Sequence, residues 1–175
     1  MLSVQHIHPM LVHFPIVLVL LLALLDTVAT MRGVPVTGRT PAGNASTGLA
    51  VLLGVFSVAA YFFGDIALEF AEDGGFSSEV AEIHEHLGMA AAAAFAIWAI
   101  IRAVVWWRNG RLPGALVSVL ELAGAGLVMA IAFYGGQTHL VDDPTRIHEE
   151  SVRLARESGG HFMDQFTYAE RATDW

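Results

Sequence analysis

The chain has 175 residues, of which 55% are hydrophobic and only 15% are charged, and its mean hydropathy is positive. Because so little polar surface is atypical of a soluble domain of this length, the composition predicts a small membrane protein. The chain contains no cysteine, which excludes disulfides, thiolate metal sites and covalently attached haem. Its net charge of −8 argues against a nucleic-acid partner.

Four apolar runs of membrane length follow one another along the chain. They are His13–Met31, about Thr47–Gly64, about Leu87–Trp107 and Ala115–Tyr134. Each is long enough to cross the hydrocarbon core as a helix, which takes roughly 20 residues. The fold class predicted is therefore all-α, with an up-and-down bundle of four transmembrane helices over residues 1–141 and an extramembrane tail over residues 142–175. Since no Arg or Lys precedes the first run and the run is longer than the usual signal-peptide core, we expect a retained helix rather than a signal peptide.

Arginine placement predicts the orientation. The connections after the first and third runs carry Arg32, Arg39, Arg108 and Arg111, whereas the connection from Asp65 to His86 carries none. By the positive-inside rule, the two arginine-bearing connections face the cytoplasm of a bacterial inner membrane. Both termini and the acidic connection are then outside.

All eight histidines lie on that predicted outer side. In an up-and-down bundle the start of the first run, the two ends of the acidic connection and the residues after the fourth run meet at one end. Imidazoles gathered at the mouth of a bundle predict a cofactor or a metal there, because ionisable residues at membrane depth tend to be functional.

Haem b is the cofactor that this pattern favours, since it takes one imidazole on each side of the ring from facing helices. His13 and His86 form the expected pair, and His8 and His139 are further candidates. His84 lies about 200° around the helix from His86, so both cannot point inward. The predicted function is electron transfer, with a bis-histidine haem near the periplasmic face.

Two alternatives stay open. His13, His86, His139 and Asp65 would also make a nitrogen and oxygen ligand set for Zn, Cu or non-haem Fe. Alternatively, the chain is a cofactor-free structural or assembly subunit whose histidines hydrogen-bond across the bundle mouth. Because no H-E-x-x-H motif is present, an electron-transfer or accessory subunit is favoured over a stand-alone enzyme.

A second polar cluster is expected toward the cytoplasmic end. Arg102, late in the third run, and Glu121, early in the fourth, reach similar depth through a tight connection. An unpaired charge in lipid is costly, so the two are predicted to form a structural ion pair, which Asp26 could join. A proton path or a quinone pocket is the functional alternative.

Several motifs together resemble a family of small four-span bacterial membrane proteins. They are HPMLVHFPIVL from residue 8, Gly64-Asp65, EIHEH at residues 82–86 and YGGQTHLV at residues 134–141. That uncharacterised family opens with H-P-x-x-V-H-F-P and closes with a G-G-x-L-V type motif, and the resemblance covers about residues 6–141. It implies a four-helix bundle with its histidines at one end and a b-type haem. His8, His13, His86 and Gly135-Gly136 match motif positions, whereas Gln137-Thr138-His139 is inserted.

The tail carries its own signals. Asp143-Pro144 and Gly159-Gly160 bracket a predicted helix of about fifteen residues. Aromatic residues that follow, among them Phe162 and Trp175, predict contact with the lipid interface or with another subunit of a membrane complex. A soluble periplasmic electron carrier is the other expected partner.

Overall fold

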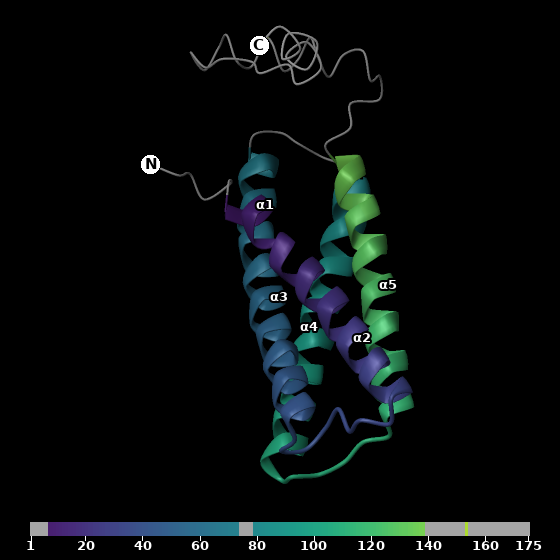
Figure 1. Ribbon diagram of the computed structural model, residues 1–175. Helices are drawn as coiled ribbons and strands as arrows, with labels where there is room; N and C mark the ends of the chain where they lie inside the picture. Colours follow the sequence, from purple (N-terminus) through teal and green to yellow (C-terminus); the bar gives the residue numbers. More distant parts are fainter. Residues whose placement is uncertain (1–6, 74–78, 139–152, 154–175) are drawn as a thin grey trace, which may run out of the picture. The chain divides into compact units, whose positions relative to one another are not determined.

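The computed structural model describes residues 7–73, 79–138 and 153, and within them every regular element is an α-helix. The helices are α1 (Ile7–Leu11), α2 (His13–Met31), α3 (Pro41–Asp73), α4 (Glu79–Trp107) and α5 (Gly114–Thr138) (Figure 1). Four helical segments are long and apolar enough to cross a membrane, with α1 and α2 together forming the first. The predicted all-α fold with four membrane-spanning helices is confirmed.

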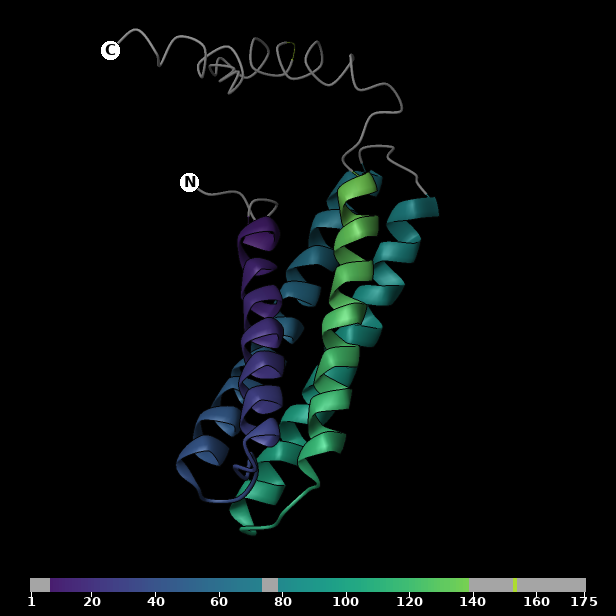
Figure 2. The same cartoon turned by 45° about the vertical axis from the view of Figure 1, so that its right-hand side comes forward.

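The four spans form a closed ring of neighbours. α2 contacts α3, α3 contacts α4, α4 contacts α5, and α5 returns to contact α2, while α1 packs on α3 (Figure 2). Successive helices run in opposite directions, so the start of α2 and the ends of α3 and α5 share one end of the bundle with the start of α4. This topology brings the described histidines to that end.

The first span is a helix with a break at Val12. Pro15 has no N–H group and therefore cannot donate to the carbonyl of Leu11, which costs the helix one hydrogen bond. The chain nevertheless stays close to helical, since Val12 has φ −60° and ψ −24° and its N–H donates to the carbonyl of His8 at 3.0 Å. The helical path thus begins at Ile7, six residues before the expected start, and includes His8.

At the arginine-bearing end, α2 and α4 end in the same way. The N–H groups of Gly33 and Val34 donate back to Thr30 and Ala29, and those of Asn109 and Gly110 donate back to Trp106 and Val105. Gly33 has φ +70° and Asn109 has φ +51°. This is the Schellman arrangement, which satisfies the last helical carbonyls through one residue in the left-handed region.

The two connections at this end bond to each other. The N–H of Arg39 donates to Asn109 Oδ1 and its Nη2 donates to the carbonyl of Trp107, both at 2.9 Å. The N–H of Leu112 donates to Thr37 Oγ1 at 3.1 Å. These hydrogen bonds therefore hold the α2–α3 and α4–α5 hairpins together at the arginine-bearing end.

At the opposite end, α3 and α4 are longer than expected. The sequence predicted a connection from Asp65 to His86, but α3 continues to Asp73 and α4 begins at Glu79. A hydropathy pattern marks only the apolar part of a helix. The helix itself can extend further into water where its polar residues favour helix. Glu79 and Glu82 lie in the first turn of α4, where carboxylates complement the helix dipole. His84 and His86 therefore lie inside a helix, and Asp65 lies well before the end of one.

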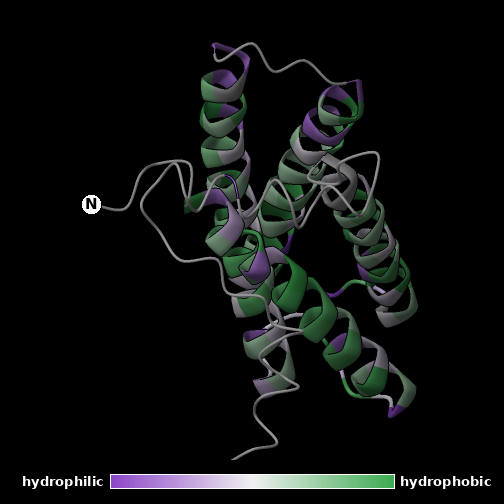
Figure 3. Ribbon diagram, turned by 90° about the horizontal axis from the view of Figure 1, so that it is seen from above, coloured by the Kyte–Doolittle hydropathy of each residue, from purple (hydrophilic) through white to green (hydrophobic). Residues whose placement is uncertain are grey.

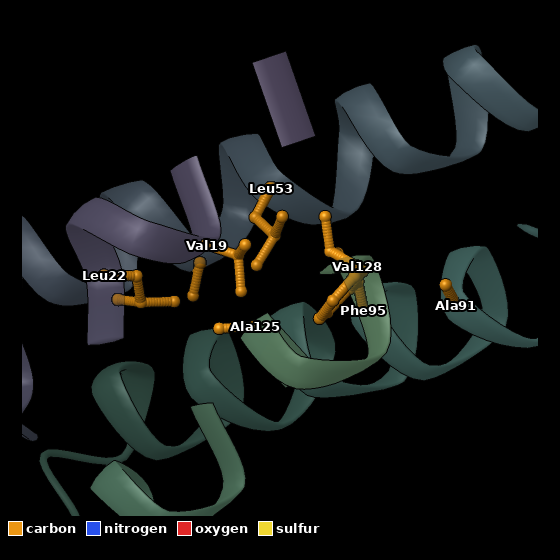
Figure 4. Close-up of a cluster of buried hydrophobic side chains, with 8 residues drawn as sticks. Val19, Leu22, Leu53, Ala91, Phe95, Ala125 and Val128 are labelled. Atoms are coloured by element: carbon orange, nitrogen blue, oxygen red, sulfur yellow. The ribbon is translucent and has the colours of Figure 1, made fainter. Parts of the chain in front are cut away.

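The core fills the centre of the bundle with side chains from all four spans. Its buried members are Val19, Leu22, Ala50, Leu53, Ala91, Phe95, Ala125 and Val128 (Figure 4). Large apolar side chains also cover the outside, for example Leu24, Ile100 and Phe133, each more than 60% exposed. Green ribbon extends along the helices in the view from above (Figure 3). An apolar exterior of this kind matches a lipid environment.

The chain divides after Thr138, and residues 139–175 form a second unit. Apart from Arg153, which is helical, that unit lies outside the described residues. The predicted tail helix and tail contacts therefore stay predictions.

Candidate functional site

His8 and His84 face each other at the end of the bundle opposite the arginine-bearing connections. His8 lies on α1 and His84 on α4, and their ring centres are 6.5 Å apart with the planes at 86°. Both side chains are half-buried. Two imidazoles from facing helices therefore meet at the predicted end, although they are not the expected two.

The ring of His8 is held by α3. Its Nδ1 lies 2.8 Å from the carbonyl oxygen of Ala60. One turn further along α3, Gly64 leaves room for the ring, since a Cβ built there would lie 2.7 Å from His8 Cε1 and 2.8 Å from Nδ1. A carbonyl and a glycine one turn apart thus fix both the orientation and the depth of this imidazole.

The ring of His84 is held by α5 in the same manner. Its Nδ1 lies 3.1 Å from the carbonyl oxygen of Ile131. Gly135, four residues later, provides the space, because a Cβ built there would lie 2.7 Å from His84 Cε1. Each imidazole therefore has a carbonyl at residue i and a glycine at residue i+4 of the helix that holds it.

This arrangement selects one tautomer. A carbonyl oxygen only accepts hydrogen bonds, so the Nδ1 atoms of His8 and His84 carry the hydrogen. The lone pair of each neutral ring is then on Nε2. Histidines that ligate metals are usually oriented in this way, by an N–H donated from the other ring nitrogen to a carbonyl or a carboxylate.

The separation of the two rings would allow both to hold one metal. If each nitrogen lies about 2 Å from the metal and the ring centre about 1 Å further back, two ring centres on one metal are at most about 6 Å apart. The observed distance between the centres, 6.5 Å, is close to this limit. His8 and His84 could therefore hold a haem iron, which would supply a one-electron couple.

The expected pair, His13 and His86, is placed differently. Both side chains are exposed on the outside of the bundle, and His13 Nδ1, at the start of α2, lies 2.7 Å from the carbonyl oxygen of Pro9 on α1. Residues two or five positions apart lie on different sides of a helical path, so His8 and His84 are half-buried whereas His13 and His86 are exposed. Of the two pairs, the structure brings together His8 and His84.

The metal-site alternative gains no geometric support from the described residues. Asp65 is exposed on α3, and no group of three or more His, Asp or Glu side chains suited to a metal ion occurs within residues 7–73 and 79–138. His139 lies outside the described residues, so the four-residue ligand set stays a prediction.

The sequence patterns did not identify His84 as a candidate ligand. The choice between His84 and His86 depends on how α4 is rotated, which the uniform alanine run after them does not reveal. A signal was nevertheless present in the motif glycines Gly64 and Gly135. Glycines at one end of a bundle mark close approach, and here what approaches is an imidazole ring.

A second polar cluster is buried deeper in the bundle, around Arg102. Its Nη1 lies 2.9 Å from Asp26 Oδ2 and 2.8 Å from Glu121 Oε1, so the predicted ion pair is present and Asp26 joins it. Nη2 donates to the carbonyl oxygen of Val36 at 2.7 Å and to Ser46 Oγ. One guanidinium thus connects α2, α3, α5 and the α2–α3 connection.

Trp98 extends this cluster toward the core. Its Nε1 donates to Glu121 Oε1 at 3.3 Å, and its ring centre lies 5.6 Å from the guanidinium carbon of Arg102. Two carboxylates share one cation, and Asp26 Oδ1 and Glu121 Oε2 have no hydrogen-bond partner among the described residues. Each carboxylate of the cluster is therefore ion-paired with Arg102 but has one oxygen without a hydrogen-bond partner among the described residues.

Comparison with known proteins agrees with the membrane architecture. A family model described as "Predicted membrane protein (DUF2231)" matches residues 5–143. The protein named L-cysteine desulfhydrase Cds1 from Mycobacterium tuberculosis (strain H37Ra) is 47% identical over 60 residues, which are 34% of this chain and 16% of that protein. The chain therefore aligns with only a small part of this relative. No solved structure matches the chain.

Proposed function

The chain belongs to the DUF2231 family of predicted membrane proteins, and from this premise we propose that it is an integral membrane electron-transfer protein that holds one haem b between His8 and His84. The observation that supports the proposal is the facing pair of imidazoles, 6.5 Å apart, each with Nδ1 on a backbone carbonyl. Haem b supplies a one-electron Fe(III)/Fe(II) couple when it is bound.

The residues of the chain hold and orient this group. The carbonyls of Ala60 and Ile131 accept from Nδ1 of His8 and His84, and this contact orients both rings in the same way. Because these carbonyls belong to α3 and α5, the two rings are positioned by rigid helices rather than by loops. Such support would restrain both imidazoles whether a bound haem iron is Fe(III) or Fe(II).

The placement of the arginines also supports a location in the membrane. The arginine-bearing connections lie together at the end opposite His8 and His84, which supports an inner-membrane protein with the histidines on the periplasmic side. A haem held there would exchange electrons with a soluble periplasmic carrier or with a neighbouring membrane subunit. The chain itself would then act as a redox subunit.

The test is an optical spectrum of the detergent-purified protein, oxidised in air and then reduced with dithionite, together with an iron and haem assay. Sharp α and β bands on reduction and one haem per chain are expected. His8→Ala and His84→Ala should each lose most of this haem. His13→Ala and His86→Ala are matched controls, since each removes an exposed imidazole near one of the pair, and both should retain it.

Three other outcomes would overturn this assignment. Haem loss in the His13 and His86 variants alone would restore the pair expected from sequence. A colourless protein with stoichiometric zinc or copper would indicate a metal site instead. A protein free of haem and metal, even when expressed with added haem precursor, would favour a cofactor-free structural or assembly subunit.

A further inference from the structure

A cavity of about 270 Å³ lies within the bundle, between the two polar clusters. Its walls are almost entirely apolar and come from all four spans. They are Val19, Leu53, Ala94, Phe95, Trp98, Leu120, Glu121, Ala123, Gly124 and Leu127. Because an apolar cavity of roughly 150 Å³ already admits a benzene ring, this one has room for a substituted ring.

The cavity reaches the lipid-facing surface between α4 and α5. Three of its lining residues, Ala94, Leu120 and Ala123, are exposed on the outside of the bundle. Two of these are alanines, which leave the wall thin where the two helices meet. A ligand that enters here comes from the bilayer and must therefore be lipid-soluble.

Glu121 gives this apolar cavity a specific polar group. Its side chain lines the cavity and is 1% exposed, and Oε1 is occupied by Arg102 and Trp98. Oε2 has no hydrogen-bond partner among the residues that the structure describes. A buried carboxylate oxygen without a partner costs free energy, and because it only accepts hydrogen bonds, a ligand with a hydroxyl that donates to it gains affinity.

We propose that this cavity binds the ring of a lipid-soluble quinol. The aromatic side chains of Phe95 and Trp98 provide apolar surface for a flat ring, and Glu121 Oε2 accepts a hydrogen bond from a ring hydroxyl. A lipid acyl chain would fill the same volume but would leave Glu121 Oε2 unpartnered. The quinol is therefore the occupant that satisfies both parts of the cavity.

The cavity also lies close to the facing histidines. Leu127 lines it, and Ile131, whose carbonyl contacts His84 Nδ1, follows four residues later on α5, about 6 Å along the helix axis. Electron exchange between a quinol and a haem at His84 rests on the proposed function. Binding of the ring does not, and the two can be tested separately.

The experiment uses the full-length protein in lipid nanodiscs and measures binding of two probes by equilibrium dialysis. The probes are a 1,4-benzoquinol and a 1,4-naphthoquinol that each carry one isoprene unit and are kept reduced in the absence of oxygen, and empty nanodiscs correct for partition into lipid. Ala94→Leu fills the lipid-facing side of the cavity, and Ala93→Leu is its matched control, exposed one residue earlier but outside the cavity. Saturable one-to-one binding is expected for the wild type and Ala93→Leu, with at least ten-fold weaker binding for Ala94→Leu.

Two further variants keep the proposals distinguishable. Glu121→Gln replaces a carboxylate acceptor by a weaker amide acceptor, so it should weaken quinol binding several-fold and leave the haem content unchanged, whereas His84→Ala should lose haem and still bind the quinol. Equal affinity of Ala94→Leu and Ala93→Leu would overturn the cavity assignment. An absence of saturable binding, with a co-purified phospholipid found by native mass spectrometry, would assign the cavity to an acyl chain instead.

Discussion

A Cβ atom on Gly135 would lie 2.7 Å from Cε1 of His84, so the imidazole occupies the space that a side chain would need. The same relationship joins Gly64 to His8 across the bundle. Each glycine therefore leaves space for an imidazole ring. Neither acts as a hinge, since both lie inside regular helices.

Substitution of Gly64 or Gly135 should release the cofactor without unfolding the bundle. Gly64→Ala and Gly135→Ala push the imidazoles of His8 and His84 away from their carbonyl partners, and we expect each to lose most of the bound haem. Gly126→Ala is the control on α5, because nothing lies within 4 Å of a Cβ there. Haem per chain, measured beside far-ultraviolet circular dichroism, checks this. An unchanged haem content in Gly135→Ala would contradict the inference that Gly135 is needed to leave space for His84.

Removal of the buried guanidinium should be strongly destabilising. Arg102→Leu leaves Asp26 and Glu121 buried without their cation, and breaking a buried pair in this way costs about 3–5 kcal/mol. Unfolding of the detergent-solubilised protein by sodium dodecyl sulfate measures the loss. Arg111→Leu, an exposed arginine in the α4–α5 connection, should change stability by less than about 0.5 kcal/mol.

A triple variant tests the cause of that loss. With Arg102, Asp26 and Glu121 all replaced by leucine, no buried charge is left, and most of the lost stability should return. If the triple variant is no more stable than Arg102→Leu, packing around the guanidinium stem and not electrostatics explains the effect.

The contact between α3 and α4 should be sensitive to a single methyl group. A Cβ on Gly54 would lie 2.7 Å from Ala99 Cβ and 3.0 Å from the carbonyl oxygen of Phe95. Gly54→Ala therefore forces the helices apart and should cost about 1–3 kcal/mol. Gly48→Ala, on the same helix with nothing within 4 Å of the added atom, should be neutral or stabilising by about 0.5–1 kcal/mol. The same unfolding assay separates the two, and equal stabilities would refute the close approach.

The end of α4 depends on the conformation of Asn109. Its φ of +51° is left-handed, and its Oδ1 accepts from the N–H of Arg39. Asn109→Ala loses the hydrogen bond and strains the backbone, which should cost about 1–2 kcal/mol. Asn109→Gly loses only the hydrogen bond, so it should be the more stable variant of the two. The reverse order of stabilities would show that the backbone conformation is not the limiting factor.

Sequence patterns predicted what long apolar runs and charge placement determine. Four runs of about twenty apolar residues require four spans, and an alternating topology places the described histidines at one end. Arg102 and Glu121 were paired correctly because the short connection between their helices sets them at equal depth. Each of these inferences depends on length and connectivity alone.

The same sequence patterns do not predict how each helix is rotated about its own axis. His84 and His86 are equally polar and two residues apart, so the choice between them depends on the residues of neighbouring helices. Gly64 and Gly135 make that choice by giving His8 and His84 space. The helical ends beyond the apolar runs were missed for a different reason, since polar residues such as Glu79 carry no hydropathy signal for a helix.

The partners of Arg102 also bear on how the chain is made. Asp26 comes from the first span, Ser46 from the second and Glu121 from the last, so no early fragment of the chain contains the full set. While the ribosome is still producing α5, the inserted guanidinium lacks one of its two carboxylates. The polar cluster is thus completed only by the final helix, and a product truncated before Glu121 has Asp26 as the one carboxylate bound to Arg102.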